Sequence, residues 1–203
     1  MTFLCVNTSF NNCSISLVSK EKNIICNEDR NNPPSDIISI LVEDSLKSAS
    51  LKINDISGII TILGPGNYTS IRVGIAFSLG LSKSMSMPIY GISALEAISI
   101  SQKKIFEKNE MYLVSIKAVK NEFFFQVFNY LSEPLSEPIK SKLSSIEKLL
   151  SNRNLVLIGP GSTEIRELIN LKNKIIETKD YIDYQKVLLH IICLLYTSPS
   201  PRD

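Results

Sequence analysis

The sequence contains no tryptophan and only one histidine, and these absences exclude several kinds of catalytic site. A zinc site with two histidine ligands cannot form within one chain. A Ser-His-Asp triad would have to use His190, which lies in an apolar run and is interpreted as a residue on a helix face. The four cysteines contain no C-x-x-C spacing, so we expect free buried thiols rather than disulfides or metal ligands.

Long apolar runs are also missing. None reaches the roughly 18 residues that a membrane-spanning helix needs, and no basic segment precedes the first apolar run. We therefore expect a cytoplasmic protein without a membrane partner.

The composition is that of a folded globular protein. The chain has 203 residues, of which 44% are hydrophobic and 21% charged, and its formal net charge is +2. These values exclude a disordered or collagen-like chain, and the charge alone gives no reason to expect a polyanion partner. The length is sufficient for one large domain or two small ones with a substantial core.

The first half alternates strands and helices. Residues 3–6, 13–18 and 24–26 are predicted to form three antiparallel strands joined by turns, and a helix is predicted from about residue 35 to 49. The run 58–63 has no polar alternation, which is typical of a parallel strand buried on both faces. A helix over 68–84, a strand over 88–91 and a helix ending near 103 are expected to follow.

The second half repeats this plan more weakly. A long hairpin is expected over 111–130, then a polar link over 132–138, and then further helices and a strand at 155–158. We predict an α/β protein of two related lobes, residues 1–104 and 105–193. Residues 194–203, which read LLYTSPSPRD, resemble a translated adapter and are expected to be a non-native tail, so that the second lobe would be truncated.

The loop that leaves the buried strand is the best candidate for chemistry. Glycines allow backbone N–H groups to approach an anion, and a helix N-terminus favours negative charge. An anion or nucleotide loop would use Gly64, Pro65, Gly66, Tyr68, Thr69 and Arg72. The loop lacks the Lys-Ser/Thr pair of a P-loop. The alternative is a tight strand-to-helix turn in which Arg72 satisfies carbonyl groups.

The helix predicted at 68–84 has apolar residues over most of its circumference, with small residues between them. A helix that is apolar all round is expected to be buried on all sides. We expect a partner helix to cover it, and packing within the chain's own core is the alternative.

Residues Gly64 to Gly74 read GPGNYTSIRVG, which resembles the G-P-G-S-[FY]-T-G-[LIV]-R-[IV]-G signature of the TsaB (YeaZ) family. The segment from Pro88 to Leu95, PIYGISAL, resembles the family's P-x-x-G-[IV]-S-[AST]-L. The resemblance is specific over residues 1 to about 100 and diffuse over 105–193. It implies an actin-like ATPase (ASKHA) fold of two ribonuclease-H-like lobes with mixed sheets.

The resemblance also implies a function. Members of the family are non-catalytic scaffold or activator subunits that pair with the catalytic subunit TsaD and act with TsaE. Together they make threonylcarbamoyladenosine beside the tRNA anticodon. On this basis the chain is expected to be an accessory subunit of a threonylcarbamoyltransferase complex, with no catalytic residue and no metal ligand of its own. It would meet tRNA only through the complex and form a weak homodimer when alone.

The implied interface lies on the helices after the third strand and after the signature. It comprises Ile38, Leu41, Val42, Leu46, Ile71, Gly74, Ile75, Ser78 and Leu79. No cofactor is expected to bind this chain tightly, although ATP can act at the level of the complex.

Two departures from the family bear on a ligand site. Asn7 stands where the family has Asp, and an amide cannot supply the anionic oxygen that a magnesium–nucleotide site requires. Lys117 and Val119 stand where the family has an acidic residue and an arginine. The alternative function is an actin-fold kinase or ATPase that uses the loop from Gly64 to Arg72 on ATP.

Overall fold

The computed structural model describes residues 1–10, 12–103, 108, 110–119, 121–151, 155–169, 175–176 and 182–197. It divides the chain into two compact units. The first unit contains Met1–Ile92 and also the end of the chain from Tyr184; the second contains Ser93–Asp183.

This division differs from the boundary predicted at residue 104. Helix α3 (Ala94–Gln102), predicted for the first lobe, packs on strands of the second unit. Helix α6 (Tyr184–Thr197), most of which was predicted for the second lobe, packs on the first unit. The helix also continues past Leu194, where helical patterning was expected to stop. The rest of the predicted tail, residues 198–203, lies outside the described residues.

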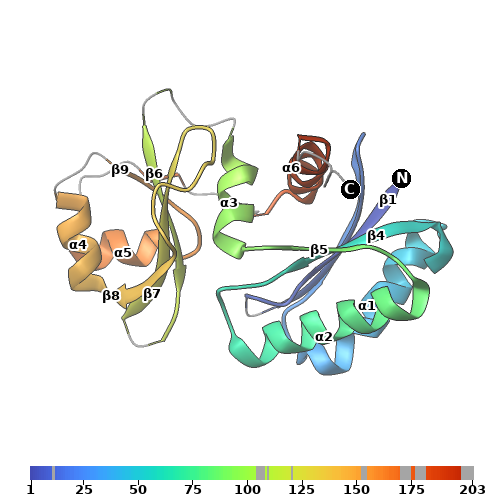
Figure 1. The fold of residues 1–203 in the computed structure, drawn as a ribbon. Helices are drawn as coiled ribbons and strands as arrows, with labels where there is room; N and C mark the ends of the chain where they lie inside the picture. The colour runs from blue at the N-terminus through green and yellow to red at the C-terminus, as the bar shows by residue number, and fades with distance from the viewer. Residues whose placement is uncertain are drawn as a thin grey trace. The chain divides into compact units, whose positions relative to one another are not determined.

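The first unit is built on a five-stranded mixed sheet (Figure 1). Strands β1 (Thr2–Asn7), β2 (Cys13–Ser19) and β3 (Asn23–Asp29) are antiparallel, which confirms the predicted hairpins. Strands β4 (Ile56–Ile62) and β5 (Ile89–Ile92) continue the sheet in parallel, giving the order β3-β2-β1-β4-β5. A short 3-10 helix, η1 (Ile53–Asp55), precedes β4.

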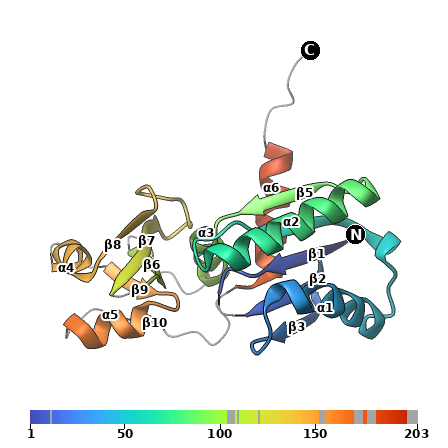
Figure 2. The ribbon, with the colours of Figure 1, turned by 90° about the horizontal axis from the view of Figure 1, so that it is seen from below.

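Helices cover both faces of this sheet. Helices α1 (Pro34–Ser48) and α2 (Tyr68–Met85) lie side by side on one face, whereas α6 crosses the other (Figures 1 and 2). The α1–α2 face forms an aliphatic core because alternate residues of β1 and β2, such as Leu4, Val6, Ile15 and Leu17, point toward it. The predicted helices and the buried parallel strand are confirmed within two or three residues at each end.

The second unit repeats the same order of strands. Strands β6 (Met111–Lys117), β7 (Glu122–Asn129) and β8 (Ile139–Lys142) are antiparallel, and β9 (Leu155–Ile158) and β10 (Ile175–Ile176) follow in parallel. The order is β8-β7-β6-β9-β10, the counterpart of the first sheet strand for strand. Helices α4 (Leu143–Ser151) and α5 (Ser162–Ile169) occupy the places of α1 and α2 in the chain.

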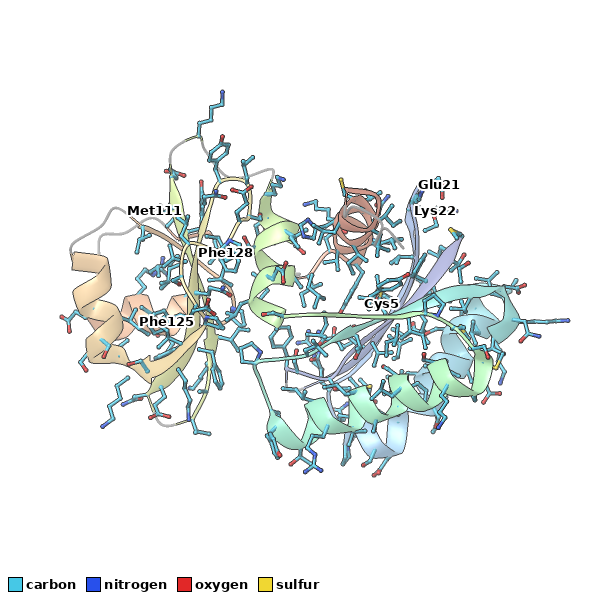
Figure 3. The ribbon with its side chains drawn as sticks, in the orientation of Figure 1. Cys5, Glu21, Lys22, Met111, Phe125 and Phe128 are labelled. Carbon is cyan, nitrogen blue, oxygen red and sulfur yellow. The ribbon has the colours of Figure 1, made fainter. Side chains whose placement is uncertain are left out.

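The core of the second unit is more aromatic than that of the first. Phe123, Phe125 and Leu113 pack with Ile146 of α4 and Ile165 of α5, and Phe125 is labelled in Figure 3. Strand β8, which follows the predicted polar link, was not expected from the sequence because lysines alternate along it. The two sheets confirm the predicted α/β class with two mixed sheets.

No helix among the described residues is long and apolar enough to cross a membrane. All four cysteines are free thiols. Cys5 and Cys13 are buried as predicted, but Cys26 and Cys193 are exposed, because Cys26 lies on the edge strand β3 and Cys193 on α6 beyond its buried face.

Candidate functional site

The loop between β4 and α2 is held tightly against the end of β1. Gly64 has a φ of 90°, a conformation that glycine adopts without strain. A Cβ atom added to Gly66 would lie 1.9 Å from the carbonyl oxygen of Ser9. The N–H of Asn67 donates to that same carbonyl at 3.0 Å. The glycines are therefore explained by close packing between two segments of the chain's own backbone.

The N-terminus of α2 is capped by the chain itself. The side-chain oxygen of Asn67 accepts a hydrogen bond from the Ser70 N–H at 3.1 Å, so Asn67 is the N-cap of this helix. Asparagine is among the preferred N-cap residues, and this signal in the sequence was missed. The Thr8 hydroxyl donates to the Ser70 carbonyl at 2.7 Å and closes the same turn from the side of β1.

Arg72 does not reach back over the loop. Its guanidinium lies 5.4 Å from the centre of the Tyr68 ring, one helical turn earlier. Tyr68, Thr69 and Arg72 are all exposed. The residues of the predicted anion loop thus form two distinct features. One is a turn that Thr8 and Ser9 hold by hydrogen bonds, and the other is the exposed pair in which Arg72 stacks on Tyr68. This geometry favours the interpretation as a tight strand-to-helix turn, although Arg72 does not satisfy its carbonyl groups.

The end of β1 holds a buried polar cluster. The Asn7 side chain is 3% exposed, and its carbonyl oxygen accepts hydrogen bonds from the N–H and the hydroxyl of Ser9 at 3.0 and 2.6 Å. The hydroxyl of Tyr184, on α6, hydrogen-bonds with the side chains of Asn7 and Ser14. Burial raises the pKa of Tyr184 well above its usual range, so the phenol is neutral at physiological pH. Asn7 is therefore a structural residue that joins β1 to its neighbours.

Burial keeps the two buried thiols of this unit in their neutral form. Burial raises the pKa of Cys5 strongly and that of Cys13 to about 11, with a smaller contribution from Asp29 at Cys13. A thiol with such a pKa is protonated at neutral pH and is a poor nucleophile and metal ligand. Among the described residues no group of three or more His, Cys, Asp or Glu side chains is placed to hold a metal ion.

The predicted interface residues on α1 are core residues. Ile38, Leu41, Val42 and Leu46 are each 9% exposed or less and pack with β1, β2 and β4. They face their own sheet because they share the inner side of an amphipathic helix whose outer side carries charged residues such as Glu43 and Lys47. The structure therefore places these four side chains in the core of their own unit, and their contact with a partner stays a prediction.

Helix α2 presents a different distribution. Gly74 and Ser78 are buried against the unit, and Ile71 and Ile75 are half-buried, but Leu79 is 52% exposed. The alternative that α2 packs entirely within the chain's own core is therefore wrong, and its cover by a partner helix stays a prediction. One side, here called the α2 outer face, is exposed throughout; it consists of Tyr68, Arg72, Ala76, Leu79, Gly80 and Lys83.

The second unit has a corresponding connection between β9 and α5. Gly159 has a φ of 98°, and the Gly161 N–H donates to the Ser115 carbonyl at 3.0 Å. The Lys117 ammonium pairs with Glu164 of α5 at 2.8 Å. Lys117, at the end of β6, therefore contributes a partly exposed ion pair to α5.

Comparison with known proteins gives consistent results. The sequence model of the family described as TsaD, tRNA N6-adenosine threonylcarbamoyltransferase, matches residues 33–189. The chain is 26% identical over 177 residues to the tRNA threonylcarbamoyladenosine biosynthesis protein TsaB of Buchnera aphidicola subsp. Schizaphis graminum, covering 83% of each chain. It is 27% identical over 200 residues to TsaB of Buchnera aphidicola subsp. Baizongia pistaciae, covering 94% of this chain and 88% of that one.

Solved structures resemble the whole chain. YeaZ from Pseudomonas aeruginosa has a TM-score of 0.75 at 16% identity and covers 97% of this chain and 94% of its own. A Bacteroides thetaiotaomicron protein with an actin-like ATPase fold has a TM-score of 0.54 at 11% identity and covers 93% and 95%.

Two mixed sheets with the same order of strands, together with these neighbours, define a protein of the actin-like ATPase fold class. Within that class, the chain belongs to the TsaD family, whose model covers more than half of it. The resemblance to TsaB (YeaZ) noted in the sequence is confirmed by relatives that extend over most of the chain.

Proposed function

We propose that this chain is an accessory subunit in the synthesis of threonylcarbamoyladenosine on tRNA, and that it docks a catalytic TsaD homologue on the α2 outer face. A TsaE homologue joins the resulting complex, and tRNA is bound by the complex rather than by this chain alone. In the absence of the partner, the same face supports a weak homodimer. The site of action is the cytoplasm.

The exposed α2 outer face is the observation that carries this proposal. Leu79 is 52% exposed and Tyr68 73% exposed, although α2 lies on the aliphatic side of the first sheet. Exposed apolar side chains that gather on one helix face are typical of an interaction surface.

An accessory rather than catalytic role is supported by the contacts of the residues that could bind a ligand, because those contacts are made within this chain. The Asn67 amide and the Asn7 side chain bind other groups of this chain, and Arg72 stacks on Tyr68. In this proposal the chain binds no cofactor tightly, and any ATP acts at the level of the complex.

The test is co-expression of the chain with the TsaD homologue of the same host, followed by size exclusion with light scattering. A one-to-one complex is expected, and Leu79→Glu should abolish it. Leu135→Glu is the matched control, because Leu135 is 51% exposed and lies in the second unit. No complex with the wild-type chain, or equal loss in both variants, would refute the proposal.

The alternative of an actin-fold kinase or ATPase makes an opposite prediction. It requires tight, magnesium-dependent binding of ATP by the isolated chain, weakened by Arg72→Gln. Titration calorimetry with ATP and Mg²⁺ separates the two functions, because the accessory role predicts no tight binding.

A further inference from the structure

Cys26 lies beside two serine hydroxyls on the face of the first sheet that α6 covers. Its Sγ is 3.8 Å from Ser14 Oγ, and in the pairing of β2 with β3 it stands opposite Ser16. Side chains of a cross-strand pair point to the same face of a sheet, as do those of residues two apart on one strand. The thiol and both hydroxyls therefore share one face, and the thiol is exposed because β3 is the edge strand.

The Ser16 hydroxyl has no hydrogen-bond partner in the described part of the chain, although Ser16 is only 1% exposed. A buried hydroxyl without a partner is costly, and each one in a native structure calls for an explanation such as a bound group or a redox role. Its cross-strand neighbours are Cys5 on β1 and Cys26 on β3. Cys5 is fully buried, so Cys26 is the neighbour that can acquire a new group from solvent.

A single oxygen atom added to the Cys26 sulfur can reach both hydroxyls. Residues directly opposite each other on antiparallel strands have Cβ atoms about 5 Å apart, so an oxygen on the sulfur can come within hydrogen-bond distance of Ser16 Oγ. Ser14 Oγ is already near the sulfur itself. A sulfenic acid, Cys–SOH, carries one O–H donor and an oxygen acceptor, and thus supplies the partner that Ser16 lacks.

We propose that Cys26 is a site of reversible oxidation, at which hydrogen peroxide converts the thiol to a sulfenic acid that the hydroxyls of Ser14 and Ser16 hold. The sulfur attacks one peroxide oxygen, so that the S–O bond forms as the O–O bond breaks. The other oxygen leaves as water with the proton that the thiol gives up, and the sulfur is oxidised by two electrons. The site lies across the sheet from α2, so this inference goes beyond the proposed function and is independent of it.

The other cysteines of the first sheet cannot remove this sulfenic acid. Cys5 lies on the same face but two strands away, which separates its Cα atom from that of Cys26 by about 10 Å, whereas a disulfide requires less than about 7 Å. Cys13 packs in the aliphatic core on the opposite face. A small thiol from solvent is therefore the group that reacts: its sulfur displaces the oxygen as water and forms a mixed disulfide, and a second thiol restores Cys26.

The first experiment traps the sulfenic acid in the intact chain. The wild type and Cys193→Ser are treated with hydrogen peroxide and then with dimedone, which labels sulfenic acids, and peptide mass spectrometry locates the label. Cys193 is the internal reference, because it is the other exposed cysteine. We expect the label at Cys26 to exceed that at Cys193 about threefold or more, the effect of a hydrogen bond, and to persist in Cys193→Ser. Equal labelling, or a disulfide between the two cysteines, would overturn the proposal.

The second experiment removes the unpartnered hydroxyl. Ser16→Ala should shorten the lifetime of the sulfenic acid about threefold, which is measured by adding dimedone after increasing delays. Ser78→Ala is the matched control, because Ser78 Oγ is also buried and unpartnered among the described residues but lies on α2, across the sheet. It should leave the lifetime unchanged, and equal lifetimes in Ser16→Ala and the wild type would refute the proposal.

Two further measurements test the same site. In the reduced chain, Ser16→Ala should unfold at the same temperature as the wild type or higher, because it removes a buried group that has no partner. A lower temperature would show that the hydroxyl already has one, and the proposal would fail. Glutathione added after peroxide should form one mixed disulfide at Cys26 that dithiothreitol reverses, and the absence of this adduct would contradict reversible oxidation.

Discussion

The two units join their fourth strand to the following helix in the same way. Gly64 and Gly159 both have a φ near 90°. In each connection a backbone N–H two or three residues later donates at 3.0 Å to a carbonyl near the end of the unit's first strand, that of Ser9 or of Ser115. The Gly-Pro-Gly sequence thus forms the same tight strand-to-helix connection in both units, here called the joint.

The difference between the units lies in the helices that these joints position. Helix α2 has 18 residues and an exposed face with apolar side chains, whereas α5 has eight residues and is tied to β6 by the pair of Lys117 and Glu164. The loop that attracts attention in the sequence is therefore common to both units. What distinguishes the first unit is the outer surface of its helix.

The largest expected effect comes from the joints themselves. Gly66→Ala should lower the free energy of unfolding by about 3 kcal/mol or more, because the new Cβ would collide with backbone. Gly161→Ala should cost less, about 1–2 kcal/mol, because the nearest atoms to its new Cβ are side-chain atoms, a Phe123 ring carbon at 3.0 Å and Ser115 Oγ at 3.1 Å. Denaturant unfolding followed by circular dichroism checks the ranking, and equal losses would contradict it.

The two faces of the α1–α2 layer should respond differently to truncation. Leu41→Ala should cost about 3 kcal/mol of stability, because it opens a cavity in the core. Leu79→Ala should change stability by no more than about 0.5 kcal/mol, because Leu79 is exposed. Thermal unfolding of the isolated chain measures both changes. A large loss of stability in Leu79→Ala would contradict the exposed position of this side chain.

Tyr184→Phe tests how α6 is attached to the first unit. Removing the hydroxyl leaves Asn7 and Ser14 with one partner fewer and should cost about 1–2 kcal/mol. Because the folded-state pKa of Tyr184 is raised, the hydroxyl's contribution is fully present below the usual phenol pKa and is lost as the pH rises above it. Between pH 8 and 11 the unfolding temperature should fall less steeply with pH in the variant than in the wild type. An equal dependence on pH would contradict the raised pKa of the buried hydroxyl.

The smallest effect is expected at the pair that distinguishes α5. Glu164→Gln should lower stability by less than about 1 kcal/mol, because both side chains are partly exposed to water. The effect should shrink in 1 M sodium chloride. A loss that is larger than that of Gly161→Ala would show that the ion pair, and not the joint, holds α5.

The sequence predicts those elements whose cause is local. Alternation reveals β2, the unbroken apolar run reveals β4, and helical spacing reveals α1. Strand β8 escapes prediction, because Lys140 and Lys142 are poor strand residues and pairing with β7 decides their conformation.

Within the candidate site, local patterns explain less. The glycines and Arg72 attract attention in the sequence, but Ser9 and Thr8, which fix the loop, approach it only through the tertiary fold. The same holds for Tyr184, which meets Asn7 from the other end of the chain. Periodicity shows that α2 is apolar all round, yet only packing shows which of its sides the chain leaves uncovered.

The placement of α6 has a consequence for synthesis on the ribosome. The first unit is discontinuous in sequence. Its sheet is complete by Ile92, but α6, which packs on β2, is translated only after the whole second unit. Until then, the buried Asn7, Ser14 and Cys5 are open to water and to other chains. The N-terminal unit therefore cannot finish folding as it emerges, and its last step waits for the final helix.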